Sequence, residues 1–220
     1  MKSLWIIPSK SALPLALVLL MVLIIPASAV EYTVGVKEGD WVKYGEISVS
    51  WNGTGTEPQS VKDAKQMDWV KVEVQSVSGT TVSMTTTSHY KNGTDTPQTD
   101  SYDVKSGQGT GGFVFVIIAA NLKKGDPITT QPNAPTINDT VTRTYAGASR
   151  SVNVLDVTFT SGSYTMKYVG RWDKATGIWL EVFTRQPDNP FAPTGAYVEY
   201  SVKATETNIW TADLLGIILG

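Results

Sequence analysis

The chain has 220 residues, 18 of them basic and 20 acidic, and it contains one histidine and no cysteine. Without cysteine there are no disulfides, thiolate zinc sites, iron–sulfur clusters or cysteine nucleophiles, and a single histidine excludes a histidine-rich metal site. The slightly acidic balance argues against a nucleic-acid partner, which requires a basic surface. Abundant threonine, valine and tyrosine favour strands, so we expect a β-rich domain that holds neither metal nor cofactor.

Residues 1–29 have the order of a secretory signal. Lys2 and Lys10 precede an apolar run over residues 13–25, and Ala27-Ser28-Ala29 follows as a small-residue cleavage site. This order predicts an exported protein whose mature chain begins at Val30. An uncleaved membrane anchor is the alternative, because no charge follows Lys10 within the segment and about 20 apolar residues span a bilayer as a helix.

Four strands are predicted in the first half of the mature chain, over residues 40–51, 69–77, 80–90 and 98–104. The alternation is clearest between residues 69 and 90, where Val70, Val72, Val74, Val82 and Met84 fall on one face. This pattern predicts a half-buried hairpin with those five side chains in the core. One helical turn is expected over residues 63–68.

The second half repeats the strand pattern after a glycine-rich connection over residues 106–112. The apolar run 113–120 is either a buried strand or a short helix, and its β-branched and aromatic front favours the strand. Five further strands are predicted over residues 137–145, 150–160, 163–172, 178–185 and 197–205. The fold class expected is all-β and mostly antiparallel: a curved sheet, half-barrel or sandwich of about nine to ten strands, preceded by an apolar signal helix.

One strand has apolar residues on both faces. In residues 178–185, Ile178, Leu180 and Val182 alternate with Trp179, Glu181 and Phe183. Such a strand cannot leave either face in water, so the Trp179 face meets a second layer or lines a cavity. We expect a cavity with Glu181 as a polar contact inside it. Trp69, on the face of its strand opposite the core, is a further candidate for ligand binding.

The candidates for catalysis are weak. His89 lies on the polar face of its strand, and no G-x-S-x-G nucleophile motif occurs, so we expect a surface histidine. A glycosidase would need paired carboxylates, for which the candidates are Asp100, Asp103, Asp156, Asp173 and Glu181. For Glu181 an ordinary ion pair with a neighbouring Lys or Arg is favoured, and Asp173 is expected to cap its own turn. We therefore expect a protein that is not an enzyme.

Three glycosylation sequons fit an exported surface. They begin at Asn52, Asn92 and Asn138. The first two are Asn-Gly pairs, which also form tight turns, so the alternative is that they are turns alone.

Two motifs carry a resemblance to known proteins. Gly39-Asp40-Trp41-Val42-Lys43-Tyr44 opens the mature domain, and Trp172-Asp173-Lys174-Ala175-Thr176-Gly177-Ile178 joins two strands. Together they resemble uncharacterised exported proteins common in archaea, which begin with a G-D-W-x-x-Y strand and often end in a single membrane helix. The second motif is also similar to a hairpin of envelope lipoprotein carriers, which are half-barrels. The resemblance implies a cell-surface location and no catalytic residues.

These observations predict a signal peptide at 1–29, an antiparallel β domain at 30–210 and an apolar tail at 211–220, which is a truncated membrane anchor or a last strand. We expect an exported, non-enzymatic module at the cell surface, associated with the membrane through its termini or with an envelope component. The first alternative is a carrier that binds a lipid or other apolar ligand in a curved sheet, and the second is a carbohydrate-active enzyme. An apolar pocket under the tryptophan-rich face would favour the carrier, a filled core with a flat face the surface module, and two carboxylates facing each other across a cleft the enzyme.

Overall fold

The computed structural model describes residues 30–53, 55–111, 115–162, 164–187 and 195–212. The predicted signal segment and residues 213–220 of the predicted tail lie outside this part of the chain. The elements in chain order are β1 (Trp41–Asn52), α2 (Gln59–Ala64), β2 (Met67–Ser78), β3 (Thr81–Tyr90), β4 (Asp95–Asp103), β5 (Gly109–Thr110), β6 (Asp139–Tyr145), β7 (Ala148–Ser161), β8 (Tyr164–Asp173), β9 (Trp179–Pro187) and β10 (Tyr197–Thr207).

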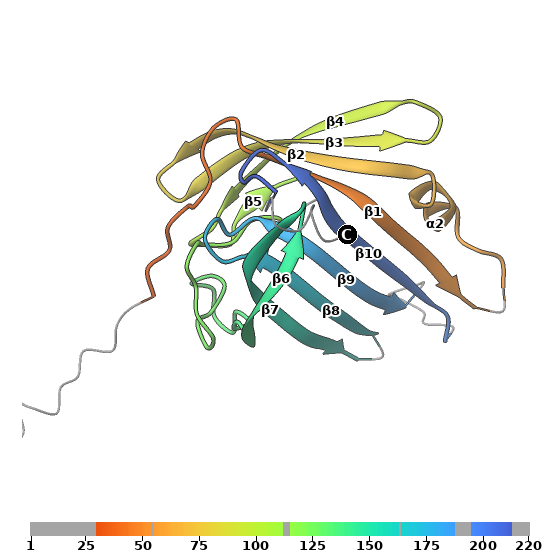
Figure 1. Cartoon of the computed structure of the whole chain (residues 1–220). Coiled ribbons are helices and arrows are strands. Elements are labelled where there is room, and N and C mark those ends of the chain that lie inside the picture. Colours follow the sequence, from red (N-terminus) through yellow and green to blue (C-terminus); the bar gives the residue numbers. More distant parts are fainter. Residues whose placement is uncertain (1–29, 54, 112–114, 163, 188–194, 213–220) are drawn as a thin grey trace, which may run out of the picture.

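All ten strands belong to one antiparallel sheet in the order β5-β4-β3-β2-β1-β10-β9-β8-β7-β6. The first and last of the long strands, β1 and β10, pair at its centre and join an N-terminal half (β1–β5) to a C-terminal half (β6–β10). The sheet is not closed, and Figure 1 shows it curving so that β2–β4 and β7–β9 face each other across its concave side. The prediction of an all-β, antiparallel fold is confirmed, and of the alternatives the chain forms one curved sheet, not a sandwich of two.

The β2–β3 hairpin has the predicted register. Val74 pairs with Met84 and Val72 with Thr86, so alternate side chains enter the same core. Val70, Val72, Val74, Val82 and Met84 are all buried and belong to one hydrophobic cluster, as predicted. The tight turn is closed by Gly79, whose φ of 59° is readily adopted only by glycine.

The described part of the apolar run predicted as a strand or a short helix is neither. Residues 113 and 114 of this run lie outside the described part of the chain, and residues 116–120 form a buried, irregular segment with one β-bridge between Ile117 and Ile178. The amide of Ile118 donates to the carbonyl of Gly177 at 2.9 Å, and that of Trp179 to Val116 at 2.9 Å. The segment is buried on all sides, so its apolar residues show no periodicity, and its backbone bonds to the β8–β9 turn instead of joining the sheet.

Two smaller predictions are also wrong. The helical turn lies at α2, four residues before the expected position, because Pro58 supplies a φ of −59° at its start and its carbonyl accepts from Val61 and Lys62. The glycine-rich connection contains the short strand β5, in which Gly109 pairs with Tyr102. A side chain at Gly109 would lie 2.4 Å from the Ser101 carbonyl oxygen, so this pairing requires glycine.

Within the described residues, no helix is both long and apolar enough to span a bilayer.

Candidate functional site

The concave face of the sheet carries mostly apolar residues in register across five strands, from β1 to β7. Residues that pair directly on neighbouring antiparallel strands point to the same side of the sheet. One such row crosses β1, β10, β9, β8 and β7 and consists of Ile47, Val202, Val182, Gly170 and Leu155. The next row consists of Val49, Tyr200, Thr184, Tyr168 and Val157. We call the side of the sheet that these rows cover the inner face.

A cavity of about 590 Å³ lies on the inner face. The sheet rows form one wall, and Met67, Val70, Phe115 and Ile128 lie among the residues on the other sides. Its described lining contains no Lys, Arg, Asp or Glu side chain. Pockets for small apolar molecules have volumes of roughly 300–1,000 Å³ and similarly apolar walls, so the cavity has the size and the chemistry of a binding site.

Phe159 marks the open side of this cavity. It is one of the lining residues, yet 43% of its surface is exposed to solvent. It stands opposite Met166, a second lining residue, at the end of the β7–β8 hairpin. Phe159 therefore extends the apolar wall of the cavity to the protein surface.

Gly170 makes room for the two rings beside it. A Cβ atom at this position would lie 2.2 Å from the ring of Trp172 and 2.8 Å from the ring of Tyr168. Because Gly170 has no side chain, Trp172 can fold back over the strand and be fully buried, while Tyr168 reaches the cavity wall. The glycine therefore shapes this part of the inner face.

Trp179 lines the cavity because of a β-bulge. Trp172 pairs with Trp179 while the preceding Arg171 pairs with Glu181, so Trp179 and Leu180 together stand opposite one residue of β8. The extra residue shifts the alternation, and Trp179 shares the inner face with Val182. Its ring lies 6.4 Å from that of Trp172, and 9% of its surface is exposed.

The same bulge separates Glu181 and Phe183 from Trp179, which corrects the expectation that the three share a face. Neither is among the lining residues of the cavity. The carboxylate of Glu181 accepts hydrogen bonds from the Tyr145 hydroxyl at 2.6 Å and from Arg171 Nη1 at 2.7 Å. Glu181 therefore belongs to an ion pair, the alternative favoured from the sequence, and the expectation that it lies inside the cavity is wrong.

Trp69 lies on the opposite side of the sheet from the cavity, on the face that also carries His89. Its ring stacks on His89 at 4.7 Å with an interplanar angle of 8°, and Lys43 Nζ lies 5.3 Å from the ring centroid. His89 in turn pairs with Asp95 at 2.6 Å. The structure therefore does not bring Trp69 and Trp179 together, and the ring of Trp69 already contacts His89 and Lys43.

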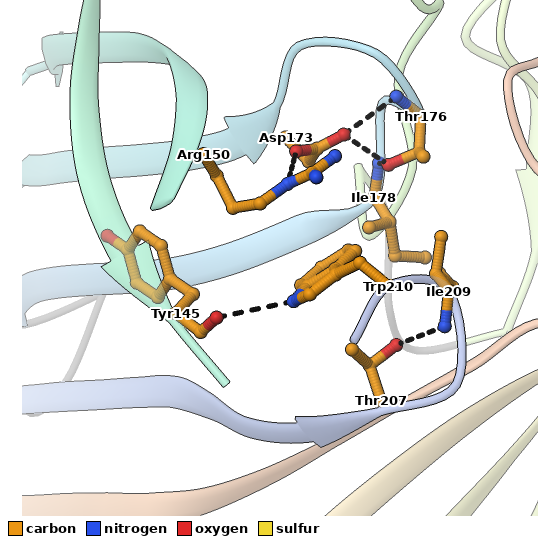
Figure 2. A network of polar contacts seen from close by, with 8 residues as sticks. All are labelled: Tyr145, Arg150, Asp173, Thr176, Ile178, Thr207, Ile209 and Trp210. Atoms are coloured by element: carbon orange, nitrogen blue, oxygen red, sulfur yellow. Dashed lines mark hydrogen bonds and ion pairs between the residues drawn. The ribbon is translucent and has the colours of Figure 1, made fainter. Parts of the chain in front are cut away.

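The buried carboxylates have protein partners. Figure 2 shows Asp173 accepting from the amide and hydroxyl of Thr176, both at 2.9 Å, and from Arg150 Nε at 2.7 Å, so it caps its own turn as predicted. The Arg150 guanidinium also lies 4.6 Å from the ring of Trp210, which donates to the Tyr145 carbonyl. These contacts tie the β6–β7 turn to the segment after β10 and hold the curled end of the sheet.

Asp100 is a second buried carboxylate, on β4. Thr86 Oγ1 and Gln98 Nε2 each donate to it at 2.8 Å. No group of three or more potential metal ligands occurs within the described ranges of the chain.

Tyr168 is one of the cavity residues that no sequence pattern singled out. Burial raises the pKa of its hydroxyl well above the usual value, so the group stays protonated and uncharged. The sequence does hold one indication of a site here. Gly170 lies two residues along the same strand, and a glycine inside a strand often marks a place where another group packs closely against the backbone.

The three sequon asparagines, Asn52, Asn92 and Asn138, are all exposed. Asn92 Oδ1 accepts from the amide of Thr94 at 3.0 Å, as an Asx turn does.

Comparison with protein-family models, with curated proteins and with solved structures found no match to this chain. The similarity to archaeal exported proteins therefore stays a prediction.

Proposed function

We propose that this protein is a non-catalytic carrier that binds an apolar ligand in the cavity on the inner face of its curved sheet. The observation that carries the proposal is the cavity itself, about 590 Å³ in volume with an uncharged and largely apolar described lining. A surface module with a filled core has no need of such a space. Burying apolar ligand surface there is favourable by about 25 cal/mol per Å², which gives the cavity a source of affinity.

The sequence supports a place outside the cell for this carrier. Lys2, Lys10 and the Ala27-Ser28-Ala29 site have the order of an export signal. A ligand that dissolves poorly in water needs a protein to shield it in an aqueous compartment. The proposal therefore combines export with transport or storage of an apolar molecule at the cell surface.

The carbohydrate-active alternative has less support from the site. Asp173 and Glu181 are paired with Arg150 and Arg171, and Asp100 is held by Thr86 and Gln98. A glycosidase needs two carboxyl groups facing one cleft, and these three point to separate partners.

The test is a titration with N-phenyl-1-naphthylamine, an uncharged probe whose fluorescence rises in apolar surroundings. Val202→Trp would fill the cavity, because Val202 lines it and lies in the same inner-face row as Ile47 and Val182. Ser201→Trp is the matched control: the same side chain on the adjacent residue, which points to the other side of β10. We expect saturable binding by the parent and by Ser201→Trp, and loss of binding in Val202→Trp. A parent protein that does not bind the probe would contradict the carrier and leave the surface module.

A further inference from the structure

Four buried polar atoms at the inner face have no hydrogen-bond partner among the described residues: Trp51 Nε1, Tyr102 Oη, Tyr168 Oη and Trp179 Nε1. The last three form one group around Tyr168, whereas Trp51 lies at the end of β1, in register with Val198 and Gln186. Tyr168 and Trp179 line the cavity, and Tyr102 packs edge-on against Phe115, a third lining residue, with ring centroids 5.9 Å apart. Buried polar atoms are normally hydrogen-bonded, so three orphans in one region call for a physical reason.

Tyr168 lies within electrostatic reach of the other two groups. The Trp179 N–H is close enough to offset in part the rise that burial causes in the pKa of Tyr168, and the Tyr102 hydroxyl contributes to that rise. Even so, none of the three has a partner at normal hydrogen-bond geometry. Tyr102 comes from β4 and Tyr168 from β8, so the cluster joins the two facing halves of the sheet.

Counting donors shows what this cluster lacks. An indole N–H donates and cannot accept, while each tyrosine hydroxyl has one hydrogen to donate and can also accept. If Trp179 donated to Tyr168 and Tyr168 to Tyr102, the Tyr102 hydrogen would still have no acceptor. Every internal arrangement of the three groups leaves at least one donor over, so the cluster is short of an acceptor.

The surroundings decide what kind of acceptor fits. The described cavity lining contains no basic side chain to neutralise a carboxylate or a phosphate. An unpaired charge buried there would carry a large desolvation penalty. A carbonyl oxygen is uncharged, has two lone pairs and can accept from two donors at once.

We propose that Tyr168 and Trp179, supported by Tyr102, bind an uncharged carbonyl or similar acceptor at the inner end of the ligand. The ligand is then an apolar chain or ring system that carries an ester, ketone or quinone oxygen, with that end buried and the rest extending toward Phe159. This inference rests on the proposed carrier function and specifies its ligand class.

The experiment compares three compounds of matched chain length as competitors for the bound naphthylamine probe: 2-tridecanone, tridecane and sodium tridecanoate. One net hydrogen bond corresponds to about a three- to tenfold difference in affinity. We expect the ketone to compete about that much better than the hydrocarbon, and the carboxylate to compete less well than the ketone.

Tyr168→Phe should remove the preference for the ketone over the hydrocarbon while keeping probe binding. Tyr200→Phe is the matched control, because Tyr200 lines the same cavity and its hydroxyl is not one of the buried orphan atoms. It should keep the preference. Equal competition by ketone and hydrocarbon in the parent, or a preference that survives Tyr168→Phe, would overturn this inference and leave the carrier in place. Failure of the parent to bind the probe would instead overturn the carrier itself.

Discussion

Two buried polar sites of the sheet, one around Asp100 and one around Tyr168, differ in their hydrogen-bond partners. On β3 and β4, the Asp100 carboxylate is 2% exposed, yet Thr86 and Gln98 satisfy both of its oxygens. On β8 and β9, Tyr168 and Trp179 bury polar atoms that no described residue satisfies. A closed core resembles the first arrangement, in which the protein supplies every partner. The second arrangement leaves polar atoms free to bond a ligand, and both residues line the cavity.

Packing differs in the same way. The β2–β3 hairpin fills its inner face with Val70, Val72, Val74, Val82 and Met84. In the C-terminal half, the bulge places Trp179 beside the cavity, and Gly170 makes room for the rings of Trp172 and Tyr168. One continuous sheet thus combines the packed β2–β3 hairpin with an apolar cavity whose lining runs from Met67 and Val70 on β2 across to Leu155 on β7.

The largest expected effect is in the packed β2–β3 hairpin. Val72→Asp places a charge at a site that is 1% exposed, and we expect the domain to unfold, since an unpaired buried charge costs several kcal/mol or more. Val77→Asp is the control on the same strand, because Val77 is 38% exposed and should change stability by less than about 0.5 kcal/mol. Circular dichroism melts measure both, and a Val72→Asp protein that melts like the parent would refute the register of this hairpin.

The next effect compares the two stacked tryptophans of the C-terminal half. Trp172 is fully buried and donates to the Phe115 carbonyl at 2.8 Å, so Trp172→Ala should cost about 3–5 kcal/mol. Trp179 borders empty space and has no partner for its N–H, so Trp179→Ala should cost less, about 2 kcal/mol. Denaturant titrations give both values. A larger loss at Trp179 than at Trp172 would mean that its side of the sheet is packed like a core.

Gly170→Ala tests the packing of the Trp172 and Tyr168 rings beside the cavity. The added methyl group would displace the rings of Trp172 and Tyr168, and overpacking of this kind costs about 1–3 kcal/mol. We expect lower thermal stability together with weaker binding of the naphthylamine probe. Gly55→Ala is the control, since a Cβ there meets no atom within 4 Å. Unchanged probe affinity in Gly170→Ala would show that these rings do not shape the site.

The smallest expected change in stability separates a hydrogen-bonded tyrosine hydroxyl from one without a partner. Tyr145→Phe removes a 2.6 Å hydrogen bond to Glu181 and should destabilise the protein by about 1 kcal/mol. Tyr168→Phe removes a buried hydroxyl without a partner and should leave the stability of the ligand-free protein unchanged or raise it slightly. Thermal melts of the ligand-free variants compare the two. A loss at Tyr168 equal to that at Tyr145 would indicate that the Tyr168 hydroxyl has a partner.

Much of the scaffold follows from the sequence because its strands are exposed on one side and buried on the other. Ile47, Val49, Tyr200 and Val202 alternate with polar residues, and all four line the cavity. The bulge could not be predicted, since Ile178 to Phe183 alternate without interruption and the extra residue is set by pairing with Arg171 and Trp172. The segment 116–120 could not be assigned either, because full burial removes the periodicity on which such predictions depend. The position of the cavity depends on both features.

In the proposed carrier, an apolar ligand binds on the inner face against Trp179. The most direct measurement is the anomalous scattering of bromine in crystals of the protein grown with a bromine-labelled alkyl ketone, 13-bromo-2-tridecanone. We predict one bromine peak inside the cavity toward Phe159, with the carbonyl oxygen beside Tyr168 and Trp179. A bromine peak on the outer face beside Trp69, or an empty cavity at saturating ketone, would contradict the account.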